Sequence, residues 1–201
     1  EATEQNNASK PATVNEQLLT ACKNPETTPE VISALINADA DVNARNSDDR
    51  DKTPLMFAVA NTTYPEVISI LIQAGANVHA RNINAITPLM FAAANTTYPE
   101  VISALINAGA EINAKGYHNE TALMFAAAFN SKPEVVTLLL QAGADVHAVA
   151  NGNRLLGTVL GEILHYPQRN SYSVKAIEWA KLNSDLKNTD VYWKLHDASF
   201  E

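Results

Sequence analysis

The chain has 201 residues, 46% of them hydrophobic, and a formal net charge of −8 at pH 7. This length predicts a single domain, and the acidic charge disfavours nucleic-acid phosphate and anionic lipid as partners. The sequence holds one cysteine, Cys22, so no internal disulfide can form and we expect packing alone to hold the fold. No apolar run approaches the ~20 residues that a membrane-spanning helix needs, so we expect no membrane insertion.

The first ten residues, EATEQNNASK, contain no large apolar side chain and predict a disordered tether over 1–10. The remaining 11–201 would then form one domain. The sequence does not begin with Met, which suggests that an upstream segment was removed. The polar start favours an exported protein over a cytoplasmic one, and both compartments stay open at this point.

A short motif recurs along the chain at a constant interval. TPLMFA begins at Thr53 and again at Thr87, and TALMFA begins at Thr121, so both intervals are 34 residues. Between 53–77 and 87–111, 21 of 25 positions are identical. Near-identity of this kind within one chain indicates a duplicated structural unit that is used several times.

Each unit carries the signals of two short helices. Thr followed by Pro suits a helix start, and apolar residues follow at helical spacing. Before the second apolar run, Ser or Thr stands three residues ahead of Glu, which predicts a capping box. These pairs are Thr27 and Glu30, Thr63 and Glu66, Thr97 and Glu100, and Ser131 and Glu134. A left-handed residue should end the second helix, namely Asp39, Gly75, Gly109 and Gly143 in the four units.

An alternating stretch follows each of these helix ends, with Val42, Val78 and Ile112 expected to point inward. The surrounding polar and turn-forming residues predict an extended loop that reverses direction, which we call a finger. Each helix should have about ten residues, fewer than the ~12–15 that an isolated helix needs. The units are therefore expected to gain stability by stacking on one another.

These residues resemble the ankyrin repeat. The segments at 87–89, 100–102 and 109–114 match the family's anchors, and the resemblance covers about 14–149. It implies an all-α solenoid of helix–turn–helix units with β-turn fingers along one edge, of about four to five repeats plus a helical C-terminal cap. The Asn-rich loops resemble those of bacterial ankyrin proteins. We place the units at about 14–46, 47–82, 83–115 and 116–149, with a divergent unit and cap at 150–201.

One departure from the family pattern concerns the His that follows Thr-Pro-Leu, which is Met56, Met90 and Met124 in this chain. Apolar packing should replace a hydrogen bond at these positions. The last unit is more divergent. We expect a first helix at 155–165, a second at 174–182 and a capping helix at 189–199, with Trp193 buried against Trp179.

Several residues could suggest chemistry, and a structural role explains each of them better. His79 and His147 are equivalent but two units apart, roughly 20 Å if packed helices lie ~10 Å from one another, which is too far for a shared metal. Asp48, Asp49 and Asp51 are interrupted by basic residues and do not form a calcium loop. Cys22 should be a small core residue. We expect no metal, no cofactor and no active site.

Two further features of the sequence have alternative interpretations. An enzyme site in 150–201 could use His165, Tyr166, Trp179 and His196, but this segment also suits a cap. Asn-x-Ser/Thr occurs at Asn7, Asn61, Asn95 and Asn119, which matters only if the chain is a eukaryotic secreted protein.

The ankyrin resemblance implies a monomeric protein-interaction module that binds an unidentified protein with its fingers and the concave face of its first helices. The alternative is a regulatory or inhibitory subunit of a separate enzyme. The candidate contact residues are Asp48, Asp49, Arg50, Ile83, Asn84, Ile86, Tyr117, His118, Phe129 and Arg154. The apolar members, Ile83, Ile86, Tyr117 and Phe129, would form a hydrophobic strip, unless they only cover the next unit.

Overall fold

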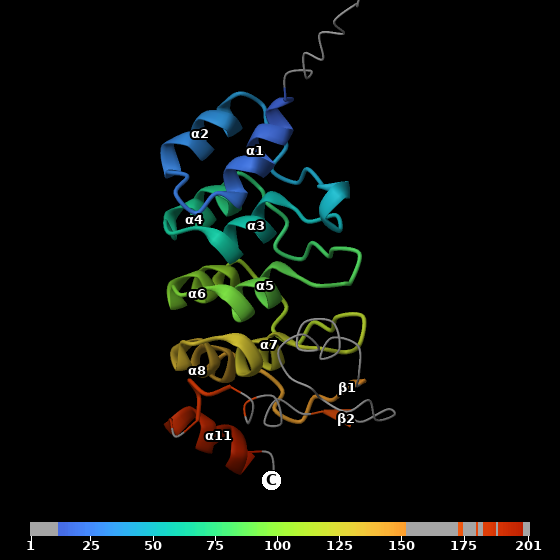
Figure 1. Cartoon of the computed structure of the whole chain (residues 1–201), viewed down its shortest axis with the longest axis vertical. Helices are drawn as coiled ribbons and strands as arrows, with labels where there is room; N and C mark the ends of the chain where they lie inside the picture. The colour runs from blue at the N-terminus through green and yellow to red at the C-terminus, as the bar shows by residue number, and fades with distance from the viewer. Residues whose placement is uncertain (1–11, 152–172, 175–179, 181–182, 188, 199–201) are drawn as a thin grey trace, which may run out of the picture.

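The computed structural model of the chain describes residues 12–151, 173–174, 180, 183–187 and 189–198. The expected tether 1–10, the expected helix 155–165 and Arg154 lie outside these residues. Helix pairs are stacked along one axis in two layers (Figure 1). The first helices are α1 (Val14–Lys23), α3 (Pro54–Asn61), α5 (Pro88–Asn95) and α7 (Ala122–Phe129). The second helices are α2 (Pro29–Asn37), α4 (Glu66–Gln73), α6 (Pro99–Asn107) and α8 (Pro133–Gln141).

The first helices form the centre of each unit interface. In α5, Leu89 and Met90 are 1% exposed and Ala92 and Ala93 are fully buried. Each first helix packs against its own second helix, and α1, α3 and α5 also pack against the first helix of the next unit. The helical-repeat solenoid expected from the sequence is thus confirmed, and the methionines that replace a polar residue are buried as expected.

The starts of the first helices agree with their sequence in two units. Thr53 accepts a hydrogen bond from Met56 N at 3.4 Å, and Thr87 accepts one from Met90 N at 3.3 Å. A proline at the first helical position follows in both. At the start of α7, the Thr121 side chain makes no capping bond, and its buried hydroxyl has no hydrogen-bond partner.

The capping boxes expected at the second helices are wrong. None of α2, α4, α6 and α8 has a side-chain capping bond. The threonine that ends the first helix uses its hydroxyl to fold the connecting turn instead: Thr62 Oγ1 accepts from Tyr64 N at 3.0 Å, and Thr96 Oγ1 accepts from Tyr98 N at 3.1 Å. A capping box does occur at the start of α1, between Thr13 and Glu16.

The ends of the second helices are as expected. Gly75, Gly109 and Gly143 have φ angles of 91°, 87° and 88°, and Asp39 has a φ of 62° in the first unit. This left-handed conformation strains any residue with a Cβ, so glycine suits it. The chain therefore leaves each helix in the same direction and enters an equivalent finger.

Asn130 and Asn183 join the last units through their side chains. Asn130 is 2% exposed, and its Nδ2 donates to Ala93 O at 2.9 Å and to Thr96 O at 3.0 Å. Asn183 Nδ2 donates in turn to Asn130 O at 2.8 Å. Asn183 thus takes the place of Asn130 one unit later, although it lies 53 residues further along the chain instead of 34.

This register corrects the expected fifth unit. Strand β1 (Ala150–Asn151) pairs antiparallel with β2 (Ser173–Val174), so these residues close a finger. Ala180, which is helical and fully buried, then lies where a first helix belongs, before the turn that Asn183 opens. Of the expected second helix 174–182, the structure describes only Val174, which lies in strand β2, and Ala180; the remaining residues lie outside the described ranges. The extra residues lie between the two strands, in 152–172.

Helix α11 (Asp190–Ala198) matches the expected capping helix and packs beside α8. Its Val191 and Leu195 are buried, at 7% and 1% exposed. The expected burial of Trp193 is wrong, since its side chain is 52% exposed. Within the described ranges, no helix combines the length and the apolar character that crossing a membrane requires.

Candidate functional site

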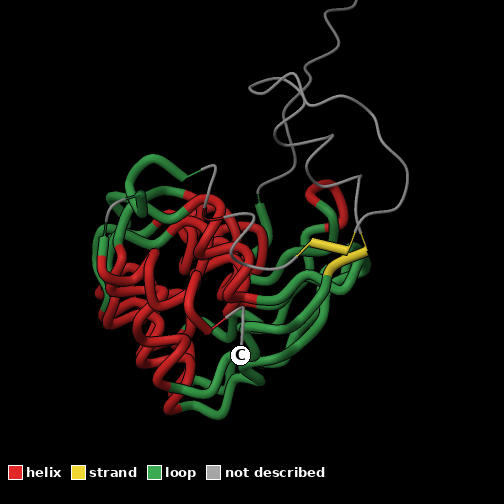
Figure 2. The backbone as a smooth tube through the Cα atoms, turned by 90° about the horizontal axis from the view of Figure 1, so that it is seen from below, coloured by secondary structure: helices red, strands yellow, loops and turns green. Residues whose placement is uncertain are grey.

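The fingers are short loops closed by their own backbone. Asn46 N donates to Lys52 O at 3.0 Å, Asn82 N to Ile86 O at 3.2 Å, and Gly116 N to Glu120 O at 2.9 Å. We name these segments the first finger (46–52), the second finger (82–86) and the third finger (116–120). Figure 2 shows the loops side by side along one edge of the molecule, apart from the helices.

A side-chain acceptor braces each finger from inside. In the first two fingers the opening asparagine serves: Asn46 Oδ1 accepts from Asp49 N at 3.0 Å, and Asn82 Oδ1 accepts from Ile86 N at 2.9 Å. In the third finger this position is Gly116, and the closing residue serves instead, since Glu120 Oε2 accepts from His118 N at 2.9 Å.

Backbone hydrogen bonds also join each finger to the next. Ile83 N donates to Arg50 O at 3.2 Å, Tyr117 N donates to Asn84 O at 3.1 Å, and Asn151 N donates to His118 O at 2.7 Å. The structure therefore brings five of the expected contact residues together on adjoining finger tips. These are Arg50, Ile83, Asn84, Tyr117 and His118.

Two arginines add further links behind the tips. Arg45 Nη1 donates to Arg81 O at 2.9 Å, and Arg81 Nη1 donates to Lys115 O at 2.6 Å. Hydrogen bonds to charged donors are stronger than neutral ones. Each finger is thereby held to its neighbour by both backbone and side-chain bonds, which favours a rigid edge.

Two large apolar side chains project from this edge. Ile83 is 61% exposed and Tyr117 is 76% exposed, and the Tyr117 ring meets the His118 ring edge-on at 5.2 Å. The expected exposure of Ile86 is wrong: it is 7% exposed, and its Cδ1 lies against Gly116 of the next finger. Phe129 is half-buried and packs 6.2 Å from the Phe125 ring. Tertiary packing thus explains Ile86 and part of Phe129, leaving Ile83 and Tyr117 as the exposed pair.

The acidic first finger is partly neutralised by its own basic residues. Asp48 and Asp49 lie in a short 3-10 helix, η1 (Ser47–Asp49), and Lys52 Nζ lies 3.1 Å from Asp49 Oδ1. Asp48 and Arg50 are exposed. No group of three or more His, Cys, Asp or Glu side chains is arranged to hold a metal ion in the part of the chain that the structure describes.

One feature of the first helices, a set of contacts between lysine ammonium groups and phenylalanine rings, was missed from the sequence. Lys52 Nζ lies 5.2 Å from the Phe57 ring centroid and 5.4 Å from that of Phe91, and Lys23 Nζ lies 4.6 Å from the Phe57 centroid. Such ammonium–ring contacts are attractive. The sequence signal for aligned aromatic rings was the recurrence of Phe at 57, 91 and 125, at the 34-residue interval.

His79 and His147 occupy equivalent exposed positions. Their backbone N–H groups donate to Asn77 Oδ1 at 2.9 Å and to Asp145 Oδ1 at 2.8 Å. At the same position in another unit, the Asn113 side chain donates to Gly143 O at 3.0 Å and so links two units. A linking role of the side chain at this position is thus seen for Asn113, while the two histidines contribute their backbone N–H groups.

Among the residues that the structure describes, Cys22 and Glu30 have clearly shifted pKa values, and neither belongs to the finger edge. Burial raises the pKa of the Cys22 thiol to about 12, and this side chain is only 3% exposed. Cys22 is therefore the small core residue that was expected. Hydrogen bonds from the Thr28 side chain and from its own backbone lower the pKa of the exposed Glu30 carboxyl.

Comparison with known proteins agrees with this geometry. A family model described as ankyrin repeats (3 copies) matches residues 4–82 and 64–150, which together cover well over half of the chain. The chain belongs to the ankyrin-repeat family. Ankyrin repeats are in general protein–protein interaction modules, and the family is typically a non-enzymatic scaffold. No curated protein sequence matches this ankyrin chain at a significant level.

Proposed function

We propose that this ankyrin solenoid binds a protein partner through its finger tips, with Ile83 and Tyr117 at the centre of the contact. The observation that carries the proposal is the exposure of these side chains, 61% and 76%, on loops whose backbones are bonded to one another. Large apolar or aromatic anchors on an otherwise polar surface are typical of binding hot spots. A backbone that is already ordered loses little conformational entropy when a partner binds.

The surroundings of this pair suit a protein interface. Asp48 and Arg50 lie exposed on the adjoining first finger and would form a polar rim. The half-buried Phe91 of α5 and Phe129 of α7 would add apolar surface from the first helices. We propose that Asn84 and His118 contribute mainly through their backbone, which sets the spacing of the anchors.

The alternative function, a regulatory or inhibitory subunit of a separate enzyme, would use the same surface. The two functions differ in the partner and not in the site. Catalysis would then reside in the partner chain, which accords with the typically non-enzymatic character of the family. An enzyme whose rate changes when the ankyrin chain is added would favour this alternative.

Affinity capture from cells of the source organism tests the proposal. The wild-type chain is compared with the double variant Ile83→Ala/Tyr117→Ala, and with the control Ser69→Ala/Gln73→Ala, which changes exposed residues of α4 in the opposite layer. We expect the finger variant to lose a captured protein about tenfold, or ~1.4 kcal/mol, while the control retains it. Equal recovery with both variants, at unchanged melting temperatures, would refute the finger site.

A further inference from the structure

Helices α2 and α6 have the same nine residues, PEVISALIN, but different surroundings. In α6, Val101 is 1% exposed and Leu105 is fully buried. In α2, the equivalent Val31 is 46% exposed and Leu35 is half-buried. Because the two helices have identical sequences, the difference in side-chain exposure must come from their positions in the stack.

The preceding unit supplies the missing cover in every other case. Helix α6 lies against α4, and α4 lies against α2. The valines of α4 and α8 at the same position, Val67 and Val135, are 2% and 0% exposed. Residues 1–11 contain no large apolar side chain that could cover Val31. Helix α2 thus leaves exposed the surface by which one unit stacks on another.

The opposite end of the solenoid also exposes a large apolar side chain. Trp193 lies two residues from both Val191 and Leu195, which at about 100° per residue places it on the other side of α11 from this buried pair. Since α11 packs beside α8, Trp193 lies on the side of α11 away from the stack. Its ring is 5.4 Å from Tyr192 and 5.5 Å from His196, both edge-on.

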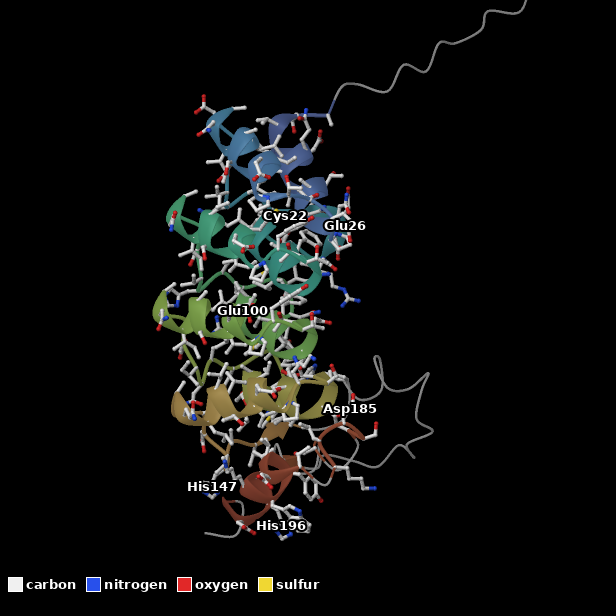
Figure 3. The ribbon with its side chains drawn as sticks, turned by 90° about the vertical axis from the view of Figure 1, so that its left-hand side faces the viewer. Cys22, Glu26, Glu100, His147, Asp185 and His196 are labelled. Carbon is white, nitrogen blue, oxygen red and sulfur yellow. The ribbon has the colours of Figure 1, made fainter. Side chains whose placement is uncertain are left out.

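The large apolar side chains exposed in the described part of the chain therefore lie either on the fingers or near the ends of the stack. Ile83 and Tyr117 lie on the fingers, while Val31 belongs to α2 and Trp193 to α11, two helices near opposite ends of the stack in Figure 1. In Figure 3, His196 lies at the end of the molecule formed by α11. We propose that two copies of this chain stack head to tail, with the α2 end of one copy covered by the α11 end of the other.

A second copy is the occupant that the contacts within the chain favour. The segment PEVISALIN of α6 is covered by EVISILIQ of α4, a second helix of nearly the same sequence. Helix α11 occupies a second-helix position beside α8, so its outer side can continue the stack in the same direction. Contact between unlike ends leaves one end of each copy free, so longer assemblies can form at higher concentration.

The contact buries only the end of one unit on each copy, so the association should be weak. A weak dimer replaces the monomer that was expected from the sequence. Each copy carries a net charge of −8, which opposes association. Added salt screens this repulsion, and we expect it to strengthen a contact made mainly by apolar groups.

Sedimentation equilibrium of the whole chain, from roughly 1 μM to roughly 1 mM, tests the proposal. The wild type should show a mass that rises with concentration. Val31→Lys and Trp193→Ala should each raise the dissociation constant at least about tenfold. Their 1:1 mixture should recover a dimer, because each variant keeps the end that the other lacks. Ile83→Ala/Tyr117→Ala is the matched control and should associate as the wild type does.

Three results would overturn the proposal. The wild type could remain monomeric over the whole range. Trp193→Ala could associate as well as the wild type, which would indicate contact between two α2 ends. The finger control could abolish association, which would assign it to the fingers. Circular dichroism of each variant shows that it is folded, which is expected since both substituted side chains are exposed.

Discussion

The carboxylate of Glu120 lies where a side chain at Gly116 would have to go. A Cβ built on Gly116 would be 2.6 Å from Glu120 Oε2, well inside van der Waals contact. The same Oε2 accepts the hydrogen bond from His118 N, so it cannot move away without releasing the third finger. Glycine at 116 and glutamate at 120 are therefore a matched pair, just as asparagine at 82 and isoleucine at 86 are in the second finger.

We predict that Gly116→Ala destabilises the protein by about 1–3 kcal/mol, the usual cost of overpacking. The double variant Gly116→Asn/Glu120→Ile copies the second finger and should restore the stability. It also removes Glu120 Oε1, a buried oxygen with no hydrogen-bond partner. Urea unfolding of both variants measures the free energy, and equal stability of Gly116→Ala and wild type would contradict the pairing.

Asn130 should be among the most sensitive polar residues. Asn130→Ala would leave Ala93 O and Thr96 O without this donor, and we expect a loss of about 2–4 kcal/mol. Asn61→Ala is the control, since the exposed Asn61 makes one bond to Phe57 O within its own helix. The control should lose under about 1 kcal/mol. Similar unfolding midpoints for the two variants would contradict a linking role for Asn130.

The identical helices α2 and α6 give a direct comparison of burial. Val101→Ala removes two methyl groups from a site that is 1% exposed, and should cost about 2 kcal/mol. Val31→Ala makes the same change at a site that is 46% exposed, and should cost under about 1 kcal/mol at low protein concentration. Thermal unfolding at micromolar concentration measures both, and equal costs would show that Val31 is covered after all.

The burial of Cys22 should make the stability of the fold depend on pH in the alkaline range. The pKa of its thiol is about 12 in the folded state, above the ordinary ~8.5. Because the folded pKa is raised, the contribution of the protonated thiol is complete below about pH 8.5 and is lost as the pH rises from there toward the folded pKa. Stability should therefore decline above about pH 8.5, and less so in Cys22→Ala.

The same burial predicts slow labelling of Cys22 by a disulfide reagent in the folded chain, because the side chain is only 3% exposed and its thiolate is disfavoured. In urea, where the thiol is solvated and its pKa is ordinary, labelling at about pH 8 should be at least about a hundredfold faster. Equal labelling rates in the two states would show that Cys22 is accessible.

The repeat itself was predictable because the same motif recurs at a constant interval in the sequence. The 34-residue interval from Thr53 to Thr87 and Thr121 located the helix pairs and the fingers, and Gly75 located a helix end. The capping boxes were mispredicted because a threonine near Glu need not serve the helix start. The Thr63 hydroxyl donates to Pro25 O of the preceding unit at 2.8 Å, and the neighbouring Thr62 folds the turn.

Other features depend on contacts between distant segments. The bond from Asn183 to Asn130 reveals the register of the fifth unit, and no local sequence pattern predicts this bond. The burial of Ile86 and the exposure of Ile83 could not be distinguished from the sequence, because both lie in one finger and only the neighbouring unit separates them. The exposure of Trp193 likewise depends on which side of α11 meets α8.

The bonds from Ile83 N to Arg50 O, from Tyr117 N to Asn84 O and from Asn151 N to His118 O recur at every junction between described fingers. Loops are ordinarily the part of a protein that moves independently, and here each tip is tied to the next through its main chain. A displacement of one finger tip is therefore passed to its neighbours through these bonds. A partner that binds Tyr117 meets an edge whose fingers move together. Substitutions at the tips can consequently change which partner is recognised without loosening the platform that presents them.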